Sequence, residues 1–228
     1  MALALAALKD LAAIKEALEP IEAAEQKAQV TDYRQRDRSV LLPSIGNIDP
    51  QIKTFAQKSD HVLQSILGLA KLFYGEDVGK KWFESLLKVA VEKYGEESSF
   101  VQFLRDVMPA LKFIRNFRNC VEHPKPNQRV VSHDFSLSAN LELVPPSIEV
   151  IHPETGQPRI GATLFMREHL DQLTNIFELF LAFLCGVNAQ PFSGIPIGIM
   201  QLPSDKRRTP HVQYSYATNF GGQATPIG

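Results

Sequence analysis

Apolar residues recur every three to four positions over five stretches of the chain, which is the spacing of an amphipathic α-helix. The first stretch runs from about Ala2 to Ala28, is rich in alanine, and contains Pro20, which we expect to kink the helix. The segment after it mixes Arg and Asp with Pro and Gly up to Pro50 and is predicted to be a connection. The predicted apolar face of the first helix consists of Leu5, Leu8, Leu11, Ala12, Leu18 and Ile21.

Three more helices are predicted before the proline-rich sequence at 124–126. The first begins at Pro50 and ends at the sequence YGEDVG, and the second carries Trp82 near its start and ends before a glycine. The third begins at Ser98 or Ser99, which are both suitable N-caps. It contains Pro109, which should bend it or split it into two segments.

The period of the pattern changes after Pro124. Between about 129 and 165, short β-branched runs alternate with turn sequences, which predicts two to four short strands in an antiparallel ribbon. A helix returns at Met166 and ends at Gly186, a natural C-cap. The rest is rich in Pro and Gly and should be disordered or draped over the body. We therefore predict a mainly α protein with an N-terminal Ala-rich helix (1–30), a helical domain (50–186) with a β insertion at about 129–165, and a C-terminal tail (187–228).

Composition and charge narrow the class of protein. Of the 228 residues, 44% are apolar and 21% are charged, as in soluble globular domains. The net charge of −1 argues against a protein that coats duplex nucleic acid, so any nucleic-acid contact must be local. Cys120 and Cys185 lie in apolar helical contexts, which predicts buried, reduced thiols and a cytoplasmic location. Lys9 and Asp10 interrupt the N-terminal apolar run, and we expect neither a signal peptide nor any membrane-spanning segment.

The candidate chemistry lies in the sequence LKFIRNFRNCVEHPKPN, residues 111–127. On a helical wheel its polar side chains share one face, opposite the apolar ones. Any surface helix shows this separation, so a solvated helix end with an Arg118–Glu122 pair is one interpretation. However, asparagine is a mediocre helix former, and here one follows each arginine, while His123 stands where Pro124 ends the helix. Arg matches a phosphate, His transfers protons near neutral pH and Asn orients either, so the set suits cleavage of a phosphodiester without a metal.

The sequence RNCVEH, residues 118–123, resembles the Arg-Asn-x3-His signature of the HEPN superfamily, whose members are small all-helical domains. The resemblance implies a HEPN-like up-and-down bundle over roughly 50–186. It also implies a metal-independent endoribonuclease without cofactor, often part of a toxin–antitoxin or antiviral defence system, that forms a homodimer joining two motifs in one cleft. Arg118 would bind the scissile phosphate, and Asn119 would align a catalytic partner. His123 would act as general acid or base while the ribose 2′-hydroxyl attacks, leaving a 2′,3′-cyclic phosphate.

Three neighbouring residues extend this prediction. Arg115 and Asn116 repeat the Arg-Asn pair one turn earlier, and with Lys125 they are expected to contact the RNA substrate. Lys125 also stands where some family members carry a tyrosine that a partner nucleotidyltransferase modifies, which argues against that form of regulation. A non-catalytic HEPN-like module for dimerisation or for RNA or nucleotide binding remains the alternative, as does an unrelated helical scaffold.

The remaining histidines fit no recognised metal site. His133 and His152, with the nearby acids Asp134 and Glu154, are predicted to be exposed at strand edges. His61 and His169 lie on helices beside apolar residues, which predicts packing or solvent roles, and the basic sequence DKRR at 205–208 is predicted to be a solvated loop.

Overall fold

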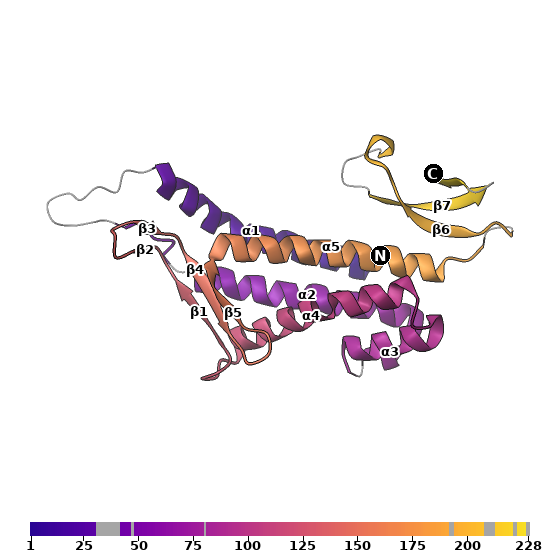
Figure 1. The fold of residues 1–228 in the computed structure, drawn as a ribbon, viewed down its shortest axis with the longest axis horizontal. Helices are drawn as coiled ribbons and strands as arrows, with labels where there is room; N and C mark the ends of the chain where they lie inside the picture. The colour runs from indigo at the N-terminus through magenta and orange to yellow at the C-terminus, as the bar shows by residue number, and fades with distance from the viewer. Residues whose placement is uncertain are drawn as a thin grey trace. The chain divides into compact units, whose positions relative to one another are not determined.

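The computed structural model describes residues 1–30, 42–46, 48–79, 81–191, 194–207, 213–220 and 223–226. Most of them are helical, which confirms the predicted mainly α class (Figure 1). The connection predicted before Pro50 lies largely outside the described residues. The helices are α1 (Ala2–Val30), α2 (Asp49–Tyr74), α3 (Phe83–Tyr94), α4 (Ser99–Glu122) and α5 (Ala162–Asn188), with short 3-10 helices η1 (Glu76–Gly79) and η2 (Ser204–Lys206).

Contacts divide the chain into two compact units. The first comprises Met1–Gly68 and Val107–Thr174, and the second comprises Leu69–Asp106 and Asn175–Gly228. Helices α2, α4 and α5 each contribute residues to both units. The predicted division at 1–30, 50–186 and 187–228 is a different one and stays a prediction. Each unit is described by its own contacts.

Helix α1 buries a stripe of small and branched apolar residues in the first unit. The buried positions repeat in steps of four and three. The apolar face predicted from the sequence is rotated about the helix axis relative to this stripe. Leu5 and Leu8, which were expected on the buried face, are 51% and 53% exposed. The small side chain of Ala7 lies on the stripe instead, where it permits close packing of the neighbouring helices. The buried positions are Ala7, Leu11, Ile14, Ala17, Leu18, Ile21 and Ala28.

Paired contacts show that α1 runs antiparallel to both α2 and α5 in the first unit. Asp10 accepts a hydrogen bond of 2.8 Å from the Lys58 ammonium, while Leu3 packs against Gly68 further along α2. On the other side, the Arg167 Nε of α5 donates to the Glu22 carboxylate over 3.1 Å. Thr163, nearer the start of α5, interacts with Glu25, further along α1. The N-terminal helix is therefore an integral part of this unit.

An aromatic cluster forms the centre of the first unit. The rings of Phe55, Phe117 and Phe165, from α2, α4 and α5, have centroids 5.3 to 6.2 Å apart. His169 stacks beside them, 4.3 Å from Phe165 and 4.7 Å from Phe113, and its Nδ1 donates to the Phe165 carbonyl over 2.8 Å. Burial lowers the pKa of the His169 imidazole. The packing role predicted for this histidine is therefore confirmed.

Two helix predictions need correction. Helix α4 continues through Pro109 without a break, so of the two predicted outcomes, a bend or a split, the split is wrong. Helix α5 begins at Ala162 instead of Met166 and continues past Gly186 to Asn188. A Cβ added at Gly186 would lie 3.7 Å from the Ile199 side chain. An alanine would also fit at this ordinary van der Waals distance, so Gly186 neither ends the helix nor is required for the contact with the C-terminal strands.

The β insertion is more elaborate than one ribbon. A three-stranded antiparallel sheet has the order β1-β4-β5, and a separate two-stranded ladder pairs β2 with β3 (Figure 1). Five strands thus replace the predicted two to four, because the turn sequences interrupt what looked like longer runs. The strands are β1 (Arg129–His133), β2 (Ser136–Leu137), β3 (Leu143–Val144), β4 (Ser147–Ile151) and β5 (Gln157–Gly161).

The C-terminal region belongs to the second unit and contains regular structure. Strands β6 (Ile197–Gln201), β7 (Tyr214–Phe220) and β8 (Gln223–Pro226) form an antiparallel sheet of order β6-β7-β8. The expectation of a disordered tail is therefore wrong for these strands. The high Pro and Gly content of the whole region obscured short runs such as IGIMQ and YSYATNF, whose branched and aromatic residues favour strands.

Helix α5 is long and apolar enough, by length and composition, to cross a membrane. The expectation that no segment reaches that length is therefore wrong, because the helix extends at both ends beyond its predicted range. Core helices of soluble proteins meet the same criterion, and α5 buries Phe165 and Leu173 in the first unit and Phe177 and Phe180 in the second.

Candidate functional site

The last two turns of α4, in the first unit, carry the predicted site residues. The helix ends at Glu122, as the position of Pro124 indicated. The backbone amide of His123 still donates to the carbonyl of Asn119 over 2.9 Å, so helical hydrogen bonding extends through this residue. The His123 side chain is exposed, whereas those of Arg118 and Asn119 are half-buried.

Arg118 is held by its own chain. Its guanidinium forms an ion pair with the Glu122 carboxylate one turn later, and Nη1 donates to Asn119 Oδ1 over 3.3 Å. The Arg118 side chain is 32% exposed and that of Glu122 is 16% exposed, so solvent only partly screens the pair. The motif is therefore a connected cluster, and its phosphate-matching group already has an anionic partner.

Glu122 is the centre of that cluster. The side-chain amide of Gln57 donates to Glu122 Oε1 over 2.7 Å, which is the main reason why the pKa of this carboxyl lies below its usual value. Burial opposes the shift, while the positive charges of Arg118, His123 and Lys53 add to it. Lys53 and Gln57 were not predicted as site residues. Their i,i+4 spacing on α2 was the only sequence signal that both reach the same neighbour.

The other predicted substrate contacts lie in different surroundings. Asn116 Nδ2 donates to Thr155 Oγ1 over 3.1 Å, which ties α4 to the turn between β4 and β5. Arg115 is exposed on the same helix. Lys125 is exposed in a tight turn, where its amide donates to the Gln128 carbonyl over 2.7 Å. The structure thus brings Arg118 and Asn119 into direct contact. His123 is related to them through Glu122, whose carboxylate is close enough to interact electrostatically with the His123 side chain.

Of the histidines and acids in the β insertion, His152 and Asp134 are bonded within the chain, whereas Glu154 is exposed as predicted. His152 Nδ1 accepts hydrogen bonds from the amides of Glu154 and Thr155 over 3.2 and 3.1 Å. Asp134 accepts from the Ser44 hydroxyl over 2.6 Å; burial alone would raise its pKa, but this and backbone hydrogen bonds lower it. The prediction of exposed side chains is wrong for His133, Asp134 and His152, which are half-buried. Within the described ranges, no group of three or more His, Cys, Asp or Glu residues is placed to hold a metal.

A cavity of about 440 Å³ adjoins the motif in the first unit. Lys53 lies at its wall and also contributes to the electrostatics of Glu122, so the cavity and the cluster are neighbours. Cys120 lines it, and burial raises the pKa of that thiol. The cavity falls in the size range of small-molecule sites. Its lining residues are Asp49, Ile52, Lys53, Cys120, Val121, Pro124, Val130, Val131 and Ser132.

Comparisons with known proteins give no match: no family model, curated protein or solved structure matches the chain. The function of the α4 end is therefore argued from its own residues and from the RNCVEH resemblance.

Proposed function

We propose that the chain is a metal-independent endoribonuclease of HEPN type, built on a HEPN-like up-and-down bundle and acting in the cytoplasm as a homodimer. The observation that carries the proposal is the cluster of Arg118, Asn119 and His123 around Glu122 at the partly exposed end of α4. A toxin or antiviral defence system, with an antitoxin or other partner protein, is the setting that the resemblance suggests.

Arg118 is the phosphate-binding group in this proposal. Its guanidinium presents a planar fork of donors that matches two oxygens of a phosphodiester. Glu122 occupies those donors in the free chain, so the scissile phosphate has to replace the carboxylate as the partner. Gln57 keeps its hydrogen bond to Glu122 during the exchange, which leaves the displaced carboxylate with a donor.

His123 is the proton-transfer group. The ribose 2′-oxygen attacks the phosphorus, the bond from phosphorus to the 5′-oxygen breaks, and the products are a 2′,3′-cyclic phosphate and a 5′-hydroxyl. The His123 imidazole of one copy accepts the proton of the 2′-hydroxyl and then, as the imidazolium, donates it to the departing 5′-oxygen, while Arg118 of the other copy holds the scissile phosphate. A positioned proton-transfer group accelerates such steps by roughly 10² to 10⁴.

A second candidate is a non-catalytic module that binds RNA or a nucleotide. The observation that favours it is the Arg118–Glu122 pair, which already neutralises the phosphate-matching group. In addition, no side-chain hydrogen bond from a described residue positions the His123 imidazole. A binding module needs neither a free Arg118 nor an oriented His123.

The test is to incubate the purified chain with a mixed single-stranded RNA in EDTA and to identify the ends of the products. We expect cleavage by the wild type with cyclic-phosphate ends, and at least a hundredfold loss in Arg118→Ala and in His123→Ala. Arg105→Ala is the matched control, because Arg105 lies on the same helix and pairs with Glu96 away from the motif.

Two outcomes contradict the enzyme. Inertness of all four proteins excludes ribonuclease activity under these conditions, and full activity of His123→Ala excludes its role. If RNA binding persists in the inert proteins and weakens steeply with salt, the binding module is the better account.

A further inference from the structure

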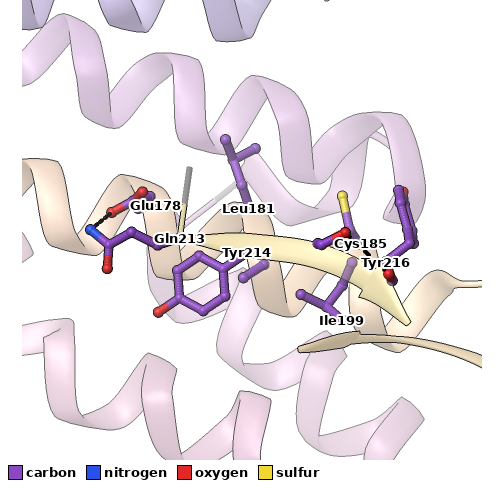
Figure 2. A pocket seen from close by; sticks show the side chains of 9 residues that line it. Glu178, Leu181, Cys185, Ile199, Gln213, Tyr214 and Tyr216 are labelled. Carbon is purple, nitrogen blue, oxygen red and sulfur yellow. Dashed lines mark hydrogen bonds between the residues drawn. The ribbon is translucent and has the colours of Figure 1, made fainter. Parts of the chain in front are cut away.

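A second hollow lies in the second unit, between α5 and the strands β6 and β7. Its volume is about 310 Å³. Figure 2 shows Glu178 and Gln213 at one end of it and Cys185 and Tyr216 at the other, with Leu181 and Tyr214 between them. The complete lining is Glu178, Leu181, Ala182, Cys185, Ile199, Gln213, Tyr214, Ser215 and Tyr216.

The hollow has a charged end and a mainly apolar body. On α5, Glu178, Leu181 and Cys185 recur at intervals of three and four and thus share one helix face. Seven residues of helix span about 10 Å, so the carboxylate lies about that far along the helix from the Cys185 end. Leu181 and Ala182 supply apolar wall between the two ends, and Ile199 adds to it at the end with Cys185 and Tyr216.

Glu178 supplies a negative charge at its end of the hollow. Its Oε2 accepts a hydrogen bond of 3.2 Å from the Gln213 side-chain amide. In the part of the chain that the structure describes, no Lys or Arg forms a salt bridge with this carboxylate. Burial, together with the charge of Glu178, raises the pKa of the Tyr214 phenol beside it. A carboxylate beside apolar walls favours a cationic partner that restores its lost solvation.

A neighbouring hollow extends the apolar part. Its volume is about 570 Å³, and it shares Cys185 and Tyr216 with the first, while Phe73 and Ile197 add apolar wall. An apolar group that lies against Leu181 therefore has room to continue beyond Tyr216. The exposed Tyr216 ring stands between the two hollows and is 49% accessible.

We propose that the hollow beside Glu178, together with the neighbouring hollow, forms a groove that binds a small amphiphilic amine. The ammonium group lies on the Glu178 carboxylate, and the apolar body lies along Leu181, Tyr214 and Ile199 toward Tyr216. The carboxylate selects for the positive charge, and the rings of Tyr214 and Tyr216 offer faces on which an aromatic body can stack. The Gln213 amide holds the carboxylate at its end of the groove. This site is independent of the α4 motif.

The experiment compares phenethylamine, which is protonated at pH 7, with the neutral phenethyl alcohol of similar shape. Both are titrated into the full chain and followed by NMR of labelled tyrosines. We expect the amine to bind about fivefold more tightly than the alcohol, as a partly exposed ion pair allows. Glu178→Gln should remove that preference, and Tyr216→Ala should weaken both compounds alike.

Glu168→Gln is the matched control, because it removes the same charge from an exposed position on the same helix. It should keep the preference for the amine, and circular dichroism verifies that each variant is folded. The proposal is overturned if neither compound binds the wild type at millimolar concentration, if both bind equally, or if folded Glu178→Gln still prefers the amine.

Discussion

Arg118 and Glu122 form the contact on which the behaviour of the α4 end depends. The same ion pair supports two accounts: it holds the guanidinium ready for a phosphate, or it is a structural pair that removes the charge from use. Exposed and half-exposed pairs of this kind contribute less than about 1 kcal/mol to folding. The pair therefore contributes little to the stability of the fold. Removing the Glu122 carboxylate tests whether it competes with RNA for Arg118.

Glu122→Gln should tighten the binding of single-stranded RNA. The substitution frees Arg118 from its anionic partner and removes one negative charge, so we expect about a threefold gain in affinity at low salt, equivalent to roughly 0.6 kcal/mol. Fluorescence anisotropy with a labelled RNA measures it. Glu154→Gln, an equal charge change at an exposed turn, should gain less. Equal gains in both variants would show that only net charge matters, and a loss in Glu122→Gln would contradict the competition.

His169 should make the fold less stable in mild acid. Burial lowers the pKa of its imidazole in the folded chain, so the unfolded chain binds the proton more readily. The contribution of neutral His169 is therefore complete above the unfolded pKa of about 6.5 and is lost as pH falls from there toward the lower folded value.

Urea unfolding at pH 7.5 and pH 5.5 measures this effect. The decrease in unfolding free energy between the two pH values should be smaller in His169→Gln than in the wild type. His61→Gln serves as control, because the His61 side chain is 51% exposed. An unchanged decrease in His169→Gln would assign the acid sensitivity to other groups.

At the scale of elements, the helices were largely predictable and their partners were not. Apolar periodicity located the five α-helices that the structure describes, since burial on one face leaves a three-to-four repeat in the sequence. It did not fix the rotation of α1, where Ala7 is buried and Leu5 is exposed, because an Ala-rich helix has no single dominant apolar face. Residue propensity also failed at Gly186, which is a natural C-cap by type but lies inside α5.

The candidate site shows the same limit. The sequence located Arg118, Asn119 and His123 at the end of one helix, and the Arg118–Glu122 pair follows from i,i+4 spacing. Gln57 could not be assigned, because its contact with Glu122 joins two helices that are distant in sequence.

Asn116 connects two elements and should matter for stability. Its amide donates to Thr155 Oγ1, which also contacts His152 Nδ1 over 3.1 Å in the turn between β4 and β5. Asn116→Ala should therefore lower the free energy of unfolding by about 1 kcal/mol, the typical loss for one hydrogen bond. Urea denaturation measures the change, and Lys112→Ala on the exposed side of the same helix is the comparison. Equal stability in both variants would show that the α4 contact with the turn is dispensable.

At the scale of the whole molecule, the proposed activity depends on a second copy of the chain. In the proposed cleft, Arg118 of one copy acts with His123 of the other, so one copy alone does not complete the site. Two inactive variants, each lacking a different catalytic group, should form a mixed dimer that contains one intact copy of each group.

The most direct measurement is the rate of RNA cleavage in EDTA after Arg118→Ala and His123→Ala are mixed, unfolded together and refolded. Each variant refolded alone should be at background. The account predicts that the mixture recovers activity clearly above both, with cyclic-phosphate ends, because the mixed dimer holds one Arg118 and one His123 in a shared cleft. A mixture that stays at the background of the separate variants, while the wild type refolded in the same way cleaves RNA, would contradict a site built from two copies of the α4 end.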